Sequence, residues 1–320
     1  MKKILVIPVK NEEWILEYTL TCASLFFDHI IVADQQSTDR TPEICALFPK
    51  VVYLENNSSA YNEGQRRQLL LDAARNFEGY NFIANLAADE IFTANILDPA
   101  AFDEVLANAE IGSAFSFQWV QLWKNTHSYR DDRSMWSNLY RPFAFIDDRK
   151  TNYLPGFAHL SIVPEAYMEN AKQIENIKVL HYQFVDFPRM LMKQRWARLL
   201  EFGKYTQPKV LKSMILNNKY YPTKDEHAIQ LAEVPKAWTL PYPDFIKIET
   251  VQSWHADACE KFITEYKPKN LRWLDIWDHD WDMFPDERNV LQRIYHKHQY
   301  VILILNKIIP KWVKKIIKGI

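Results

Sequence analysis

Short apolar runs alternate with segments of helical periodicity along the first ninety residues of the chain. The apolar runs predict strands at residues 3–9, 29–34, 51–55 and 80–86, and the first is typical of a buried parallel strand. Apolar residues recur every three or four positions over 12–26, which predicts a helix, and 63–76 predicts another. Thr41 and Pro42 mark a further helix start. Strands that alternate with helices in this way indicate βαβ units, so the predicted fold class is α/β with a mainly parallel sheet.

The pattern is less regular after residue 97. Asp98 and Pro99 predict a helix to about residue 108, and 113–123 predicts a strand. Residues 124–155 are polar and aromatic with little periodicity, so we expect loops there. The elements predicted after them are strands at 158–163 and 178–184, a helix from Asp186 to about residue 204, and a mainly helical remainder.

The last thirty-three residues form a basic amphipathic tail with no acidic residue after Glu287. Its cations are Arg288, Arg293, Lys297, Lys307, Lys311, Lys314, Lys315 and Lys318. Apolar residues alternate with these cations, at Ile302, Leu305, Ile308, Ile309, Trp312, Val313, Ile316 and Ile317. Apolar and cationic positions found together favour contact with a membrane surface, although a solvated helix packed on the protein is the alternative.

Composition places the chain among ordinary globular proteins. Of its 320 residues 48% are hydrophobic and 14% are aromatic, which is enough for a large core. The formal net charge of −1 gives no field that would collect nucleic acid, so no nucleic-acid partner is expected. Three widely spaced cysteines fit neither a disulfide framework nor a zinc site. Reduced thiols, and the lack of a signal-peptide core or a membrane span, point to the cytoplasm.

Candidate chemistry lies just after the predicted strands, because ligands of open parallel sheets bind beyond the carboxyl ends of the strands. Asn11 follows the first strand, Asp34 ends the second, and Asp89 and Glu90 follow the fourth. An acid can accept a hydrogen bond from a nucleobase or a ribose, or hold a divalent cation that neutralises phosphate charge. No Gly-rich phosphate loop is present, so phosphate binding as in dinucleotide folds is not supported.

Four segments in order resemble glycosyltransferase family 2 and its relatives with the GT-A fold. They read IPVKNEEWILEYTL, IIVADQQSTDRTPEI, NEGQRRQLLLDAAR and FIANLAADEIFT, and they cover about the first 95 residues. VLHYQF with the following helix resembles the second half of the same domain. The resemblance implies a GT-A α/β/α sandwich over residues 1–204, followed by a mostly helical extension at 205–287 and the basic tail at 288–320.

The resemblance also implies roles for matching positions. Pro8, Val9 and Asn11 would line the nucleotide pocket, and Asp34 would hydrogen-bond the base. Arg66 or Arg67 would lie near the nucleotide or its diphosphate. Asp89 and His181 would hold Mg²⁺ or Mn²⁺, which stabilises the departing nucleoside diphosphate. Ala87 replaces the first acid of the family's Asp-x-Asp motif, so fewer protein ligands remain for the metal.

Inverting members of the family need a general base that deprotonates the acceptor hydroxyl. Asp131, Asp132, Asp147 and Asp148 are candidates by residue type and region. We favour Asp132 because the flanking Arg130 and Arg133 would hold it in place.

The predicted function is transfer of a sugar from a nucleotide sugar, expected to be UDP-linked, to a glycan or lipid-linked acceptor. The expected setting is bacterial surface polysaccharide or lipopolysaccharide assembly, with the tail on the inner face of the plasma membrane. A sugar nucleotidyltransferase is one rival, although such enzymes usually carry a Gly-rich basic loop after the first strand. A sugar-nucleotide-binding protein that has lost catalysis is the other rival, and Ala87 supports it.

Each candidate residue also has a structural interpretation. Asp34 could cap a turn, Asp89 could be a solvated strand end, and His181 could be a satisfied core residue. One of the two neighbouring arginines could face solvent, and the four loop aspartates could be surface acids. The helical spacing of Trp273, Trp277 and Trp281 favours packing over sugar stacking.

Overall fold

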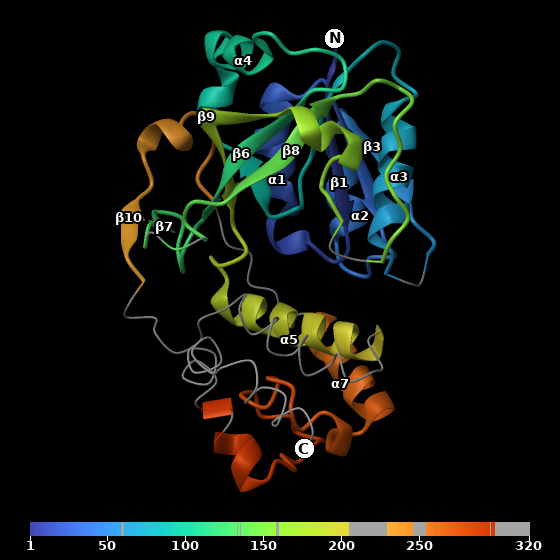
Figure 1. The fold of residues 1–320 in the computed structure, drawn as a ribbon, viewed down its shortest axis with the longest axis vertical. Helices are drawn as coiled ribbons and strands as arrows, with labels where there is room; N and C mark the ends of the chain where they lie inside the picture. Colours follow the sequence, from blue (N-terminus) through green and yellow to red (C-terminus); the bar gives the residue numbers. More distant parts are fainter. Residues whose placement is uncertain are drawn as a thin grey trace, which may run out of the picture. The chain divides into compact units, whose positions relative to one another are not determined.

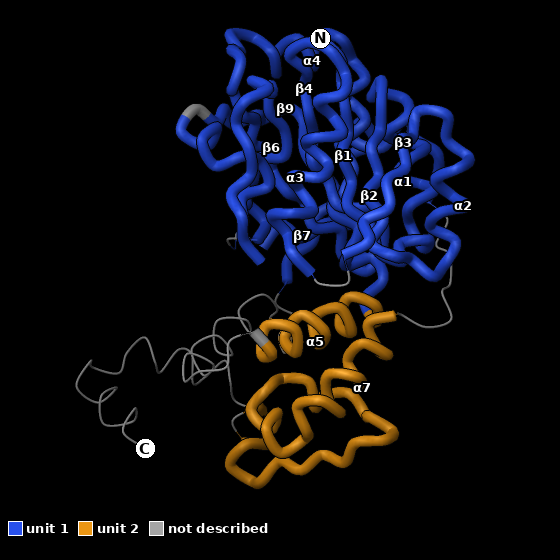
Figure 2. The backbone as a smooth tube through the Cα atoms, turned by 90° about the vertical axis from the view of Figure 1, so that its right-hand side faces the viewer, with its two compact units in different colours: residues 1–187, 229–250 blue, residues 188–228, 251–320 orange. Residues whose placement is uncertain are grey.

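The computed structural model describes residues 1–58, 61–132, 134, 136–157, 160–204, 229–245, 254–294 and 296–297. The chain divides into two compact units, which Figure 2 shows in different colours. The first unit comprises residues 1–187 and 229–250, and the second comprises 188–228 and 251–320. Packing therefore assigns the helix after Asp186 almost entirely to the second unit.

A sheet lies at the centre of the first unit (Figure 1). It has eight strands in the order β3-β2-β1-β4-β8-β6-β9-β5. The strands are β1 (Lys3–Val9), β2 (His29–Asp34), β3 (Val51–Glu55), β4 (Phe82–Asn85), β5 (Glu90–Phe92), β6 (Ala114–Gln121), β8 (Tyr140–Ile146) and β9 (Ala171–His181). β1 pairs in parallel with β2 and β4, as do β2 with β3 and β6 with β9. β8 is antiparallel to both neighbours, and β5 is antiparallel to β9.

Helices cover both faces of the sheet because alternate strand residues point to opposite sides. On one face, α1 (Glu13–Phe26), α2 (Thr41–Ala46) and α4 (Pro99–Leu106) pack against β1 residues such as Leu5 and Ile7. On the other face, α3 (Glu63–Ala74) packs against Ile4 and Val6. The predicted α/β/α sandwich with a mainly parallel sheet is therefore confirmed.

The prediction of loops over residues 124–155 is confirmed for most of the described residues but is wrong at two strands. This region contains the short β7 (Ser128–Arg130) and the central strand β8, whose Phe143, Ala144 and Phe145 are fully buried. Proline normally argues against a central strand because it cannot donate to the ladder. Pro142 lies where the pairing of β8 with β6 shifts register, so the structure tolerates it.

Two other strand predictions need correction. Residues 160–163 are not a strand, and 158 and 159 lie outside the described residues. β9 begins at Ala171 rather than at 178, and its first half carries exposed polar side chains with only Ile174 and Ile177 buried. This half was missed because it lacks a continuous apolar run. The three-residue β5 is too short to give a sequence pattern of its own.

Residues 229–245 belong to the first unit, although they follow the predicted start of the helical extension. β10 (Leu231–Glu233) pairs antiparallel with β7, and η5 (Lys236–Trp238) follows it. Tyr242 is buried in a cluster that includes Trp14 and Tyr182. This segment therefore forms part of the core that lies against the start of α1.

The second unit has its own core, built from α5 (Phe187–Lys204), α7 (Trp254–Tyr266), η6 (Pro268–Asn270) and the turns that follow. Trp277 and Trp281 are buried, and each indole donates to a backbone carbonyl oxygen at 2.9 Å. Trp273 is 39% exposed. Two of the three tryptophans therefore serve in packing.

Cys22, Cys45 and Cys259 are free and buried, and burial raises the pKa of each thiol to about 12.

Among the residues described, no helix is long and apolar enough to cross a bilayer. The tail from residue 298 onward lies outside the described residues, so the amphipathic helix predicted there stays a prediction.

Candidate functional site

Six strands end at one edge of the sheet. β1, β2, β3, β4, β6 and β9 run in the same direction, because β8 is antiparallel to both β4 and β6. The chain first extends the sheet from β1 towards β3 and later adds β4 on the other side of β1. This reversal is a topological switch point, where open α/β sheets bind ligands beyond the carboxyl ends of their strands.

The loop after β1 is bonded to the loop after β2. Asn11 has a φ of 53°, a left-handed conformation that asparagine tolerates better than most residues. Its backbone N–H donates to Ser37 Oγ at 2.7 Å, and its side-chain oxygen accepts from the Thr38 N–H at 2.7 Å. Pro8 is partly exposed and Val9 is buried. Three predicted nucleotide-pocket residues therefore lie together at the switch point.

Asp34 is held in a fixed orientation beside this loop. One carboxylate oxygen accepts from the Ser37 backbone N–H at 3.1 Å and from the Ser37 hydroxyl at 2.5 Å. The other oxygen accepts from the Tyr53 hydroxyl at 2.6 Å. A carboxylate offers about four acceptor positions, so these three bonds leave room for one more donor. Burial, together with the bond to Asp34, raises the pKa of Tyr53, which keeps this phenol a donor.

The first turn of α3 brings the two arginines to the same edge, because α3 follows the carboxyl end of β3. Gly64 permits a close approach here: a Cβ at Gly64 would lie 2.7 Å from the Leu154 carbonyl oxygen. Arg67 forms an ion pair with Glu63 and donates to the Ser161 carbonyl oxygen. Arg67 therefore fastens the 160–161 segment to the helix.

Arg66 differs from its neighbour. Its guanidinium carbon lies 4.9 Å from the centre of the Tyr61 ring. Its Nε is buried, and among the described residues nothing accepts a hydrogen bond from that atom. A donor without an acceptor is costly in a folded protein, so an anionic ligand would relieve the cost. Of the two arginines, Arg66 is the one with a buried donor atom, Nε, for which the described residues offer no acceptor.

Asp89 and His181 meet at the ends of β5 and β9. Glu90 is the register partner of His181, which places Asp89 just beyond the pair. Asp89 Oδ2 lies 3.6 Å from His181 Nε2, and both side chains are almost completely buried. Two ligand atoms can share one cation of the size of Mg²⁺ when they lie within about 4.2 Å, twice the usual bond length. The donor types and their spacing therefore fit a divalent cation.

Asp89 and His181 would have to act with other ligands. Among the described residues, no three His, Cys, Asp or Glu side chains gather closely enough to hold a metal ion by themselves. Mg²⁺ commonly keeps water and substrate phosphates in its coordination sphere, so two protein ligands are compatible with it. Glu90 is buried as well, but its Oε2 accepts from the Ala87 N–H at 2.7 Å.

Gln121 was not predicted as a site residue, yet it touches His181. Its Oε1 lies 2.6 Å from His181 Nδ1, and the side chain is 1% exposed. Trp119 stacks on the imidazole with a centroid distance of 4.4 Å and an interplanar angle of 23°. Gln121 lies near the end of the predicted strand 113–123, so its polarity at a strand end was the available signal.

The four candidate bases do not lie together. Asp147 and Asp148 follow β8 next to Asn81, at the edge where β1 and β4 begin, and they bind Arg75 and Tyr167. This edge is opposite to the one that holds Asp34 and Asp89. Asp131 is exposed beyond β7.

Asp132 lies beside Asp131 in the loop that leads to β8. It accepts from Arg130 Nε at 2.6 Å and from the Ser134 N–H at 3.1 Å. Burial opposes ionisation of Asp132, but the hydrogen bonds from Ser134 and Arg130 outweigh it and lower the pKa of Asp132. Asp132 is therefore ionised at neutral pH, as a general base must be.

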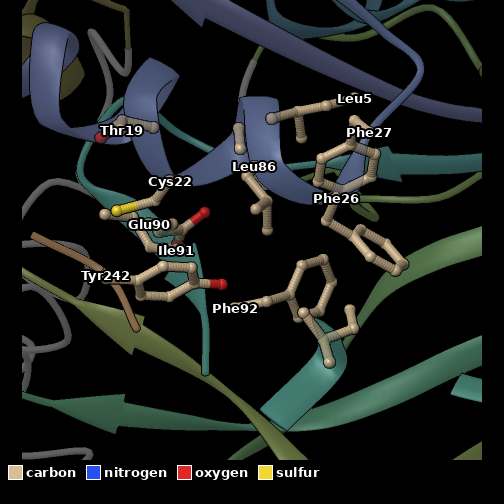
Figure 3. Close-up of a pocket in the computed structure, with 12 residues that line it drawn as sticks. Leu5, Thr19, Cys22, Phe26, Phe27, Leu86, Glu90, Ile91, Phe92 and Tyr242 are labelled. Carbon is tan, nitrogen blue, oxygen red and sulfur yellow. The ribbon is translucent and has the colours of Figure 1, made fainter. Parts of the chain in front are cut away.

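A small pocket opens against α1 and β5 (Figure 3). It is lined by Leu5, Thr19, Cys22, Ala23, Phe26, Phe27, Leu86, Glu90, Ile91, Phe92, Ile96 and Tyr242. None of these residues is basic, and most are apolar. The pocket therefore does not offer the charge that a diphosphate requires.

The fold and this edge define an α/β protein of the nucleotide-binding type, with acids and arginines gathered at a topological switch point. Residues 4–158 match the sequence model of glycosyl transferase family 2, which supports a family 2-like glycosyltransferase protein. The match extends well beyond the first 95 residues and includes β8. The sandwich agrees with the GT-A fold expected from the resemblance, and the match to this family supports a transferase.

No curated protein matches the chain by sequence. Similar solved structures include a putative glucose-1-phosphate thymidylyltransferase from Bacillus anthracis, with 12% identity, a TM-score of 0.38, and 57% of this chain and 89% of that chain covered. An inositol-1-phosphate CTP transferase from T. maritima has 9% identity and a TM-score of 0.35, with the same 57% and 89% covered. Likenesses at these TM-scores carry no argument about activity.

Proposed function

We propose that this protein transfers a sugar from a nucleotide diphosphate sugar, UDP-linked, to a glycan or glycolipid acceptor with inversion at the anomeric carbon. The observation that carries the proposal is that two groups of polar residues, the two halves of the site, lie at one edge of the sheet. The Asn11–Ser37–Asp34 network forms one half, and the pair Asp89 and His181 forms the other. The first half follows β1 and β2 at the switch point, and the second lies farther along the same edge, where the residues after β4 meet the end of β9.

Each half suits one part of the donor. Asp34 has one acceptor position left for a nucleobase N–H, and its other bonds hold the carboxylate in place. A divalent cation held by Asp89 and His181 would neutralise charge on the departing diphosphate. Arg66 would donate to the diphosphate from the first turn of α3, where the helix dipole also favours negative charge.

Calorimetry with a panel of nucleoside diphosphates, with and without Mn²⁺, tests the proposal directly. We expect UDP to bind, and to bind more tightly when Mn²⁺ is present. Arg66→Gln should weaken UDP binding about 10- to 100-fold, because a hydrogen bond to a charged group contributes about 1.5–3 kcal/mol. Arg67→Gln is the matched control, and its main effect should be on stability through Glu63 and Ser161.

The outcomes of this panel separate the possible functions. If none of the nucleotides binds, the glycosyltransferase proposal is wrong. If Arg67→Gln weakens UDP binding and Arg66→Gln does not, the assignment of the two arginines is reversed. Metal-independent binding without sugar transfer would favour the second candidate, a sugar-nucleotide-binding protein without catalysis, which Ala87 at the first acid position of the motif supports.

We also propose that the protein transfers sugar to its acceptor at the cytoplasmic surface of the plasma membrane, in surface polysaccharide or lipopolysaccharide assembly. The support comes from the helical turn that begins at Val290. Its polar residues Gln292 and His296 are buried, whereas its apolar residues Val290, Leu291 and Ile294 are 72%, 72% and 50% exposed. This inverted arrangement precedes a tail in which cations alternate with apolar residues. Apolar side chains beside cations are suited to an anionic lipid surface.

Sedimentation with vesicles of anionic or zwitterionic phospholipid tests this surface. The triple variant Val290→Ser, Leu291→Ser, Ile294→Ser should lower partition onto anionic vesicles about 10-fold or more, since each apolar side chain contributes about 1.5–3 kcal/mol when buried. The exposed Leu47→Ser is the matched control in the first unit and should bind like the wild type. Equal binding of the triple variant, or equal binding to zwitterionic vesicles, would contradict the proposal.

A further inference from the structure

Gln121 has an amide whose orientation is fixed by its neighbours. Its Nε2 donates to the backbone carbonyl oxygen of Trp119 at 3.1 Å. If the amide were turned over, two carbonyl oxygens would face each other without a proton between them. Oε1 of Gln121 must therefore be the atom that faces His181, at 2.6 Å from Nδ1. The side chain is almost completely buried, so water does not offer an alternative partner.

This orientation determines where the His181 proton lies. An amide oxygen only accepts hydrogen bonds, so Nδ1 of His181 must carry the proton. In the neutral imidazole the lone pair then belongs to Nε2. Nε2 lies 3.6 Å from Asp89 Oδ2, which is longer than a hydrogen bond and suits two atoms that both offer lone pairs.

The imidazole is also prevented from turning. β6 and β9 lie side by side in the sheet (Figure 1). Gln121 and His181 are register partners in these two strands. Trp119 stacks on one side of the ring, and the Phe184 ring meets it edge-on at a centroid distance of 5.9 Å. A ring flip would break the bond to Gln121, and the ring could rotate only by pushing against Trp119 and Phe184.

We propose that Gln121 is a positioning residue: it fixes the Nδ1–H tautomer of His181 and so directs the Nε2 lone pair towards Asp89. The inference rests on the proposed function only where it names the ligand, a divalent cation shared by these two side chains. Residues that orient a metal-bound histidine in this way typically change metal affinity 10- to 100-fold when they are replaced.

Nuclear magnetic resonance of the metal-free full chain tests the tautomer. Long-range correlations between ring protons and ring nitrogens, with histidine labelled by ¹⁵N, report which nitrogen carries the proton. The His181 signals are identified by their loss in His181→Gln. We expect Nδ1 protonated and Nε2 bare in the wild type. A wild-type His181 protonated at Nε2 would overturn the proposal, whether Nδ1 is protonated or not.

Mn²⁺ affinity measured by calorimetry on the same proteins gives the second measurement. Gln121→Leu should remove the preference of His181 for the Nδ1–H tautomer and weaken Mn²⁺ binding about 10- to 100-fold. Gln121→Glu keeps an acceptor for Nδ1–H and should restore binding. Gln118→Leu is the matched control on β6, because Gln118 bonds to Ser137 and Lys178 rather than to His181.

The two proposals fail in different ways. If Gln121→Leu keeps both the wild-type tautomer and the wild-type Mn²⁺ affinity, the role of Gln121 is wrong. If the wild type has the Nδ1–H tautomer but does not bind Mn²⁺, the metal assignment in the proposed function is wrong, and the control of the tautomer by Gln121 is supported.

Discussion

Replacing Asp89 with asparagine is expected to lower kcat/KM for sugar transfer at least about 100-fold, which corresponds to about 2.7 kcal/mol of transition-state stabilisation. Asparagine keeps the shape of the side chain but removes its charge. Asp89 is buried beside Nε2 of His181, and Ala87 provides no second acid in the motif. With so few protein ligands, the charge of Asp89 should account for much of the metal affinity. UDP binding should then no longer depend on Mn²⁺.

Asp98→Asn is the matched control for this variant. Asp98 caps α4 by accepting from the Ala100 N–H, and asparagine caps helices equally well. Steady-state kinetics and calorimetry on both variants give the comparison. If Asp89→Asn keeps the wild-type kcat/KM, or keeps the Mn²⁺ effect on UDP binding, Asp89 is not the metal ligand.

The same kinetic assay tests Asp132, which we propose as the general base. Asp132→Asn should lower kcat about 100-fold, at the low end of the range for acid–base catalysis, and leave UDP affinity unchanged. The low end is expected because the bonds from Arg130 and Ser134 lower the pKa of Asp132, and a weaker base abstracts a proton less effectively. An unchanged kcat would exclude Asp132 as the base.

Replacing Arg75 with methionine is expected to lower the free energy of unfolding by about 3–5 kcal/mol. Arg75 donates to both oxygens of Asp147, at 2.9 Å and 2.8 Å, and Asp147 is 2% exposed. Removal of the arginine leaves a buried carboxylate without its cation. Tyr167, whose hydroxyl lies 3.5 Å from Asp147, cannot replace a charged partner.

Urea unfolding of Arg75→Met, of a control variant and of a double variant, each compared with the wild type, measures this effect. Arg40→Met, at an exposed position, is the matched control and should change stability little. The double variant Arg75→Met, Asp147→Asn should regain most of the loss, because no buried charge remains. A loss below about 1 kcal/mol, or a double variant no more stable than Arg75→Met, would contradict this account.

The first three strands could be predicted from the sequence to the residue, at 3–9, 29–34 and 51–55. The first two are buried along most of their length, and such parallel strands need apolar residues at nearly every position, so their pattern is local and continuous. The third is an exposed edge strand that still has a run of β-forming residues. β8 could not be predicted in this way. Its sequence begins with Tyr140, Arg141 and Pro142, and only its place between β4 and β6 makes it a strand.

The candidate site likewise has residues that the sequence predicts and residues that only the tertiary structure brings in. The sequence alone shows that predicted strands are followed by Asn11, Asp34 and Asp89. The parallel sheet then places these residues at one edge. The family resemblance added His181. The contact between His181 and Asp89 depends on β5, which is too short to recognise, and on its pairing with β9. Gln121 enters the site through a further pairing, that of β6 with β9.

The sequence by itself determined that this chain contains a parallel α/β unit, which residues follow its first strands, and which family it resembles. Those properties depend on local periodicity and on short motifs. Only the tertiary structure decided that Arg67 and Asp147 bind within the fold, that Nε of Arg66 has no acceptor in the described part of the chain, and that Gln121 faces His181. Such contacts join residues far apart in the chain, and neither periodicity nor residue type reports which strand will lie next to which.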